Sequence, residues 1–254
     1  MAFAMNRLPR HAIRARQALI AATVLAGAGL ILHGQFLYAD ISQAGGLSLS
    51  ISSALSLIGL QLAVIGLLGA LEPTLRGMTA GLLTLAAIAA IPLGMEPSAA
   101  IGSSLAWQMQ AHILISMFAY GLLTVGAIVA TFSLVQDRRL RTGRLTSGHE
   151  LFAPVETTEK LLFGVASAGF IGLLIAVVSG IAFVEDLFAQ HLVHKTILSL
   201  MALVLFGVLL GGRVFAGWRG RRAVFLYLWG FATLCLAYFG SRFVLEVLLN
   251  RSWG

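Results

Sequence analysis

The sequence predicts an all-α fold, a polytopic membrane helical bundle of about seven transmembrane helices with the N-terminus in the cytoplasm. Of its 254 residues, 59% are hydrophobic and only 11% are charged, whereas a soluble domain carries about 25% charged residues. The apolar residues form long blocks, and the mean hydropathy is +0.93. So few charges cannot cover a water-soluble domain of this length, and we therefore expect a lipid bilayer as the solvent.

Seven apolar blocks approach the length of about 20 residues that a membrane-spanning helix needs. They cover residues 17–37, 49–71, 77–93, 112–135, 161–184, 194–212 and 223–248. The first block has a long apolar core and no small-x-small cleavage site before Asp40, so we expect it to remain as a helix. The third is short and contains Pro92 near its end. We predict a basic cytoplasmic segment at residues 1–16 and a single membrane domain at residues 17–254.

The arginines predict the orientation of these helices. They lie before the first block and in the loops after the second, fourth and sixth blocks: Arg7, Arg10, Arg14, Arg16, Arg76, Arg138, Arg139, Arg141, Arg144, Arg213, Arg219, Arg221 and Arg222. With seven crossings, all of these segments lie on one side. The opposite loops contain acidic residues and almost no Lys or Arg: Asp40, Glu96, Glu185 and Asp186. The positive-inside rule therefore predicts a multi-pass protein of the plasma (inner) membrane with these arginines in the cytoplasm.

The same pattern explains the net charge of +7 without nucleic acid as a partner, since no basic stretch is interleaved with aromatic residues. In the longest cytoplasmic loop, Pro154 with Glu156 and Glu159 is typical of the first turn of a helix. The one cysteine, Cys235, lies inside an apolar block and is interpreted as a packing residue. The sequence contains no known catalytic motif, so we do not expect an enzyme.

Histidines are the residues that could carry chemistry. His33, His112 and His194 lie near the outer ends of three different predicted helices. Two imidazoles from different helices commonly hold haem iron in a helical bundle, and polar groups inside a membrane tend to be functional. His112 and His194 are the predicted iron ligands, with His33 as a third candidate. The alternative is that each is an interfacial residue bonded to water or to a backbone carbonyl.

Other charged residues near the outer face could bind an anion. Arg242 and Glu246 are four residues apart in the last block and can pair on one face. Arg242 could instead bind a haem propionate, and Lys195 could do the same or extend outward to water. His191 and His194 are three residues apart, but two ligands alone are weak evidence for zinc.

Several segments together resemble one family. They are His112–Ser116 (HILIS), Pro154–Phe163 (PVETTEKLLF), His194–Ser199 (HKTILS), Gly211–Arg213 (GGR), Gly217–Arg221 (GWRGR) and Ala237–Arg242 (AYFGSR). This pattern is similar to the cytochrome c assembly protein family, in the YpjD/HemX-like branch related to CcsA and CcmC. The similarity is most specific over residues 108–254, while the first hundred residues match in hydropathy and in His33.

The resemblance implies a haem-binding integral membrane protein that acts in cytochrome c assembly or haem homeostasis, with haem b as cofactor. Family histidines at the outer ends of helices ligate haem, and His112 and His194 match these positions. Two features depart from the family pattern: the tryptophan-rich WWD loop is absent, with only Trp107 before His112, and members of this branch usually have eight helices rather than seven.

These departures leave a second interpretation open. The protein could be a membrane scaffold or regulator of a haem-biosynthesis enzyme, without direct haem transfer, and with a membrane or cytoplasmic protein as partner. Small-molecule transport ranks last, because Gly45-Gly46 and Pro92 lie near helix ends and not at mid-membrane.

Overall fold

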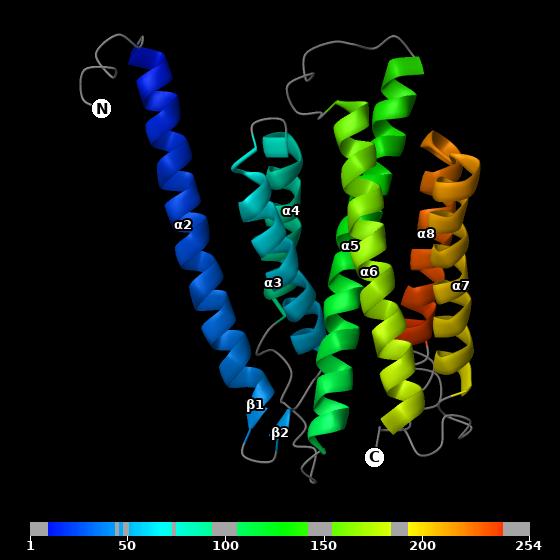
Figure 1. The fold of residues 1–254 in the computed structure, drawn as a ribbon. Helices are drawn as coiled ribbons and strands as arrows, with labels where there is room; N and C mark the ends of the chain where they lie inside the picture. Colours follow the sequence, from blue (N-terminus) through cyan, green and yellow to red (C-terminus); the bar gives the residue numbers. More distant parts are fainter. Residues whose placement is uncertain are drawn as a thin grey trace. The chain divides into compact units, whose positions relative to one another are not determined.

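The computed structural model describes residues 10–43, 46–47, 51–72, 75–92, 106–141, 154–183 and 193–240. Within these residues the chain forms seven α-helices, two two-residue strands and one π-helical turn (Figure 1). In chain order they are α2 (Arg10–Ile41), β1 (Ser42–Gln43), β2 (Gly46–Leu47), α3 (Ile51–Gly69), α4 (Arg76–Ala90), α5 (Trp107–Arg141), α6 (Val155–Phe183), α7 (Val193–Ala216), α8 (Gly220–Cys235) and η3 (Leu236–Gly240). The predicted all-α membrane bundle is confirmed.

Five of the helices are long and apolar enough to cross a bilayer, in the ranges Gln17–Ile41, Ser52–Gly69, Trp107–Arg141, Val155–Phe183 and Val193–Ala216. The helix α4 has 15 residues, so it extends about 22 Å, less than the bilayer core of about 30 Å. The helix α8 has 16 residues and continues directly into η3. Residues 241–248 of the seventh predicted block lie outside the described residues.

Several helices extend beyond their apolar blocks. The helix α5 begins at Trp107 and ends at Arg141, so Arg138 and Arg139 lie in a helical turn and not in the loop that we expected. An apolar block marks only the part of a helix inside the hydrocarbon, whereas polar residues can continue the helix into the interface. The predicted start of α6 is confirmed, because Pro154 directly precedes the helix and its carbonyl accepts the Thr158 backbone N–H at 3.0 Å.

The chain divides into two compact units. The first unit contains α2, α3 and α4, and α3 packs against both of the others. Small residues allow close packing of α3 on α4, since a Cβ atom at Gly59 would lie 2.9 Å from the Cβ atom of Ala89. The helix α3 also buries Ser53 and Ser56, which form hydrogen bonds with Asp40 and His33 of α2. In the first unit, α3 therefore packs on α4 through small apolar residues and on α2 through hydrogen bonds.

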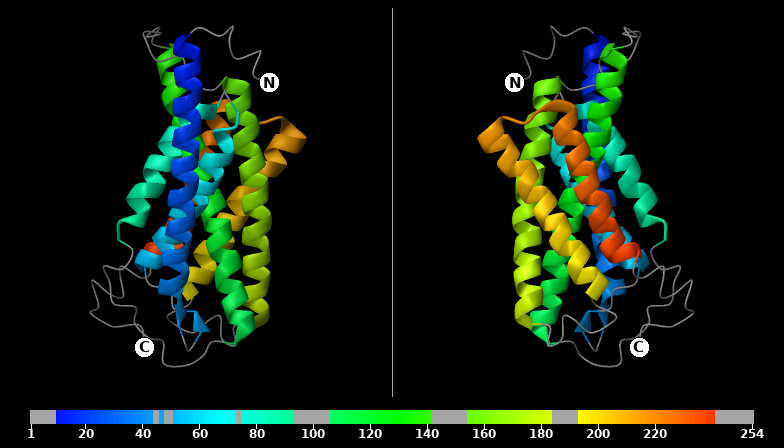
Figure 2. Two further views of the ribbon diagram at one scale, coloured as in Figure 1. Left: turned by 90° about the vertical axis from the view of Figure 1, so that its left-hand side faces the viewer. Right: turned by 90° about the vertical axis from the view of Figure 1, so that its right-hand side faces the viewer.

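The second unit contains α5, α6, α7, α8 and η3. The helices α5 and α6 run antiparallel and pack closely at glycines of α6, where Gly169 faces Leu123, Gly172 faces Ala119 and Gly180 faces His112. Small residues at such contacts let the backbones of membrane helices approach. The helix α7 crosses α6 obliquely (Figure 2).

Tyrosines attach α8 to α5. Tyr227 is fully buried, and its hydroxyl donates to the Leu123 carbonyl at 3.0 Å. Tyr120 donates in the opposite direction, from α5 to the carbonyl of Leu234. Since a hydrocarbon solvent cannot satisfy a phenol, both hydroxyls bond to backbone carbonyls of the neighbouring helix.

Large apolar side chains remain on the outside of both units. Val24 of α2 and Leu68 of α3 are 64% and 61% exposed, and Val178 of α6 and Val204 of α7 are 57% and 63% exposed. Such a surface would be unfavourable in water but is the expected one for helices that face lipid.

Candidate functional site

His112 lies in the second turn of α5 and is half-buried against α6. Its Nδ1 atom is 2.9 Å from the hydroxyl oxygen of Ser179. That hydroxyl in turn donates to the Ala176 carbonyl, one turn earlier in α6, at 3.0 Å. Within the described residues, the one side-chain hydrogen bond of the imidazole involves Nδ1 and not Nε2.

A glycine of α6 makes room for this ring. A Cβ atom at Gly180 would lie 3.1 Å from Cε1 of His112 and 3.8 Å from each ring nitrogen. The Cε1 edge of the imidazole therefore rests on the backbone of α6. Ser179 and Gly180 contact the ring from adjacent positions, one by a hydrogen bond and the other by the absence of a side chain.

His194 lies in the first turn of α7, and its side chain is exposed. Figure 1 shows the first turns of α5 and α7 at one end of the second unit, the end at which α6 finishes. His112 and His194 therefore belong to the same end of this unit. Among the described residues, no hydrogen bond joins the two rings.

His33 belongs to the first unit and contacts α3. Its Nε2 atom is 2.6 Å from the hydroxyl oxygen of Ser56. Nearby, the Ser53 hydroxyl donates to the Asp40 carboxylate, also at 2.6 Å. Since His33 uses its Nε2 atom for this contact, ligation through that atom would require the Ser56 contact to break.

The structure describes fewer contacts for the remaining predicted site residues. Arg242, Glu246 and His191 lie outside the described residues. Lys195 lies beside His194 in the first turn of α7. Among the described residues, no group of three or more His, Cys, Asp or Glu side chains is arranged to hold a metal ion. Two histidines are enough to ligate haem iron, whereas a zinc site usually has three or four protein ligands.

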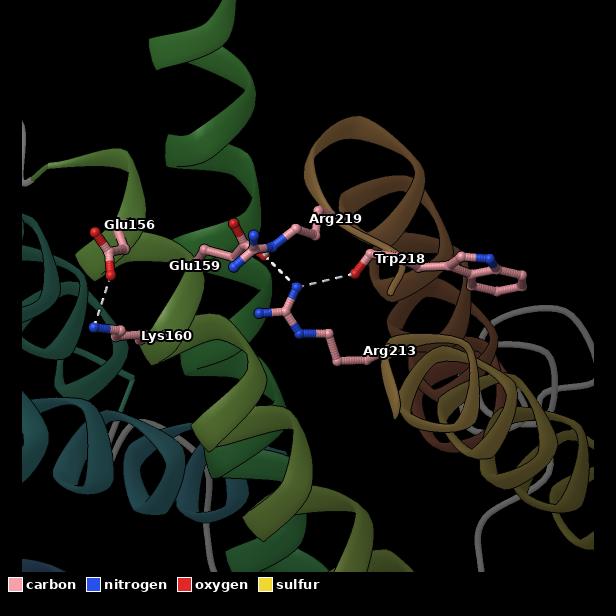
Figure 3. Close-up of polar contacts among 6 residues, drawn as sticks. All are labelled: Glu156, Glu159, Lys160, Arg213, Trp218 and Arg219. Atoms are coloured by element: carbon pink, nitrogen blue, oxygen red, sulfur yellow. Dashed lines mark hydrogen bonds and ion pairs between the residues drawn. The ribbon is translucent and has the colours of Figure 1, made fainter. Parts of the chain in front are cut away.

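A second polar cluster lies at the opposite end of the second unit, and its contacts could not be predicted from the sequence. The Glu159 carboxylate of α6 accepts a hydrogen bond from Arg213 of α7 at 2.6 Å and one from Arg219 at 3.0 Å (Figure 3). Arg213 also donates to the Trp218 carbonyl at 3.3 Å, and its guanidinium lies 4.6 Å from the centre of the Phe163 ring. This cluster ties the turn between α7 and α8 to α6.

The turn itself depends on glycine. Gly217 has a φ of +63°, a conformation that other residues rarely adopt. The chain thereby folds back so that the Trp218 N–H reaches the Gly212 carbonyl at 3.0 Å, and the Trp218 ring packs where a side chain at position 212 would lie. Arg222 then lies over this ring at 4.9 Å from its centre. The GWRGR segment, whose arginines were used to predict the orientation, thus also has a specific fold.

Two further ion pairs, both formed by Asp137 of α5, lie at the same basic end. Asp137 pairs with Arg141 on its own helix at 3.0 Å and with Arg221 of α8 at 3.7 Å. The surrounding side chains of Arg138, Arg139 and Arg222 are exposed. This end of the unit therefore presents a strongly positive surface, as the positive-inside rule predicts for a cytoplasmic face.

Comparisons with known proteins agree with this architecture. The model of a family described as cytochrome C assembly protein matches residues 17–249. Inner membrane protein YpjD of Escherichia coli (strain K12) is 33% identical over 140 residues, which cover 55% of this chain and 53% of that protein. An uncharacterized 28.8 kDa protein in the nifR3-like 5' region of Azospirillum brasilense is 34% identical over 142 residues, which cover 55% of this chain and 52% of that protein.

The aligned part of the chain spans about half the length of these curated relatives. No solved structure matches the chain. The apolar helices and the relatives agree on a multi-pass protein of the inner membrane. Since the family model covers most of the sequence, including both His112 and His194, the chain belongs to the cytochrome c assembly protein family.

Proposed function

We propose that the protein binds haem b within the membrane and acts in cytochrome c assembly or haem homeostasis. The observation that supports this most strongly is the environment of His112. Its Nδ1 atom lies 2.9 Å from the Ser179 hydroxyl, and the part of the chain that the structure describes gives its Nε2 atom no hydrogen bond. A metal-binding histidine usually has one nitrogen on the metal and the other in a hydrogen bond.

His194 is the proposed second ligand. It begins α7 at the same end of the second unit, and its exposed ring can turn toward a bound group. Lys195 and Arg242 are the proposed cationic partners of the haem propionates, since carboxylates form their strongest hydrogen bonds with such groups. Bound haem would supply an iron centre, whereas the protein residues would bind and orient the ring.

We further propose that the protein acts by binding and not as an enzyme. The segment before His112 has Trp107 but no tryptophan-rich WWD loop. This departure favours holding or sensing haem over its direct transfer to an apocytochrome. The role of His33 is proposed as secondary, because its Nε2 atom already contacts Ser56.

Absorbance spectroscopy tests this proposal directly. The protein would be expressed with a haem supply and purified in mild detergent, and a Soret band with the pyridine haemochrome of haem b is expected. The double variant His112→Ala/His194→Ala should lose the band, whereas His149→Ala, in the predicted cytoplasmic loop after residue 135, should keep it. A wild type without a Soret band after haem loading would overturn the proposal. If haem is bound, the content of c-type cytochromes in a deletion strain separates the two proposed roles. A fall in this content would indicate cytochrome c assembly, and an unchanged content would indicate haem homeostasis.

A second function, regulation of a haem-biosynthesis enzyme through a cytoplasmic partner, is supported by the positive end of the second unit. Arg138 and Arg139 are exposed in the last turn of α5, near the ion pairs of Asp137. Replacing Arg138 and Arg139 by Gln tests this function. Loss of the cellular phenotype with an unchanged haem spectrum would favour regulation, and an unchanged phenotype would exclude a role for this surface.

A further inference from the structure

The contact between His112 and Ser179 belongs to a row of two hydrogen bonds that ends on a backbone carbonyl. A serine hydroxyl carries one hydrogen and two acceptor lone pairs. The hydroxyl of Ser179 donates its hydrogen to the Ala176 carbonyl at 3.0 Å. With that hydrogen on the carbonyl, the hydroxyl accepts on its other side, which favours a hydrogen on Nδ1 of His112, 2.9 Å away.

This direction selects one form of the ring. A neutral imidazole has a hydrogen on one nitrogen and a lone pair on the other, and the partner of the first nitrogen determines which form is present. With its hydrogen on Nδ1, His112 has the lone pair on Nε2. The Ala176 carbonyl can only accept a hydrogen bond. A bond from the Ser179 hydroxyl to it therefore favours His112 as the donor to Ser179.

Gly180 fixes the position of the same ring. The Cβ atom of an alanine there would lie 3.1 Å from Cε1 of His112, which is closer than an ordinary van der Waals contact. The ring would have to move away from α6, and the hydrogen bond from Nδ1 to Ser179 would lengthen. The glycine thus permits the distance at which the serine acts.

We propose that Ser179 and Gly180 are positioning residues that hold His112 in the Nδ1–H tautomer, with Nε2 directed to a metal ligand site. The identity of that ligand as haem iron rests on the proposed function, whereas the tautomer is a property of the protein alone. Ser179 would act on the ligand only through His112, as outer partners of metal-binding histidines generally do.

The tautomer can be measured without haem. The protein would be labelled with ¹⁵N-histidine and studied by solid-state NMR in lipid bilayers, and the signals of His112 would be identified by their loss in His112→Gln. Wild type should show His112 as the Nδ1–H tautomer. Ser179→Ala should shift these signals toward a mixture of tautomers, and Ser179→Thr should retain them because it keeps a hydroxyl at the same place.

Matched controls lie on the same helix. Ser167 donates to the Phe163 carbonyl of α6 at 2.9 Å, as Ser179 does to the Ala176 carbonyl, and no hydrogen bond to a histidine is found for it among the described residues. Ser167→Ala should leave the His112 signals unchanged. Gly180→Ala should perturb them, whereas Gly164→Ala should not, since no atom lies within 4 Å of a Cβ there. Unchanged His112 signals in Ser179→Ala would overturn the proposal.

Haem titration of the same variants separates this inference from the proposed function. Loss of such an outer partner typically weakens metal binding by about 10- to 100-fold, so Ser179→Ala should bind haem that much more weakly and Ser179→Thr nearly as well as wild type. If no variant binds haem, the proposed function fails and the tautomer result stands by itself. If Ser179→Ala changes the tautomer but binds haem as tightly as wild type, the positioning role toward haem is overturned.

Discussion

The guanidinium of Arg213 in α7 donates a 2.6 Å hydrogen bond to the carboxylate of Glu159 in α6. Both side chains are largely shielded, with 27% and 19% of their surfaces exposed. The same carboxylate also accepts from Arg219 in the turn after α7. One acidic side chain thereby joins two helices and the turn that leads to α8.

Loss of this carboxylate should destabilise the second unit. In Glu159→Gln, Arg213 keeps its place beside Phe163 but loses its charged partner. A largely shielded group that is left without its partner costs about 1–3 kcal/mol, so the thermal unfolding midpoint in detergent should fall. Glu156→Gln is the matched control, because Glu156 lies in the same turn but forms an exposed pair with Lys160. Equal midpoints for the two variants would show that the cluster does not stabilise the protein.

A methyl group at Gly126 should also destabilise this unit. Its Cβ atom would overlap the hydroxyl and ring of Tyr227, which is fully buried and bonded to the Leu123 carbonyl. Overpacking of a fitted core costs about 1–3 kcal/mol, measured as a lower unfolding temperature for Gly126→Ala. In Gly164→Ala, where the surroundings are open, the better helix propensity of alanine should instead add roughly 0.5–1 kcal/mol. A Gly126→Ala variant as stable as wild type would contradict this packing.

The predicted orientation can be tested with single cysteines in a Cys235→Ser background. A membrane-impermeant maleimide added to intact spheroplasts should label Ser98→Cys, which lies in a predicted outer loop. It should label Ser147→Cys, in the predicted cytoplasmic loop, only after the membrane is permeabilised. The physical reason is the arginine bias of the loops, which favours their retention in the cytoplasm. The reverse labelling pattern would show that the orientation is wrong.

Much of the fold could be predicted from the sequence because lipid imposes a simple requirement on it. Each backbone group in the hydrocarbon must be bonded within its own helix, so a long apolar block indicates a helix directly. The helix ends could not be predicted in this way. Trp107 and Arg141 lie outside the apolar block but inside α5. The π-helical turn at Leu236–Gly240 was also missed, and it follows Leu234, whose carbonyl accepts the Tyr120 hydroxyl from another helix.

The candidate site could be predicted in part. His112 and His194 are conspicuous in the sequence because imidazoles are rare in apolar segments. Ser179 and Gly180 are not, since serine and glycine occur throughout these helices and only the register of α6 on α5 brings them to His112. The pairing of Glu159 with Arg213 likewise depends on how α7 crosses α6. Such contacts arise from tertiary packing and leave no local pattern.

Electron paramagnetic resonance of the ferric haem-loaded protein tests the central claim most directly. Two imidazole ligands give low-spin iron, so the wild type should show a low-spin spectrum with one haem per chain. His112→Ala and His194→Ala should each give high-spin iron or lose the haem, while His149→Ala should match the wild type. A low-spin spectrum that persists unchanged in His112→Ala would contradict the assignment of His112 as an iron ligand.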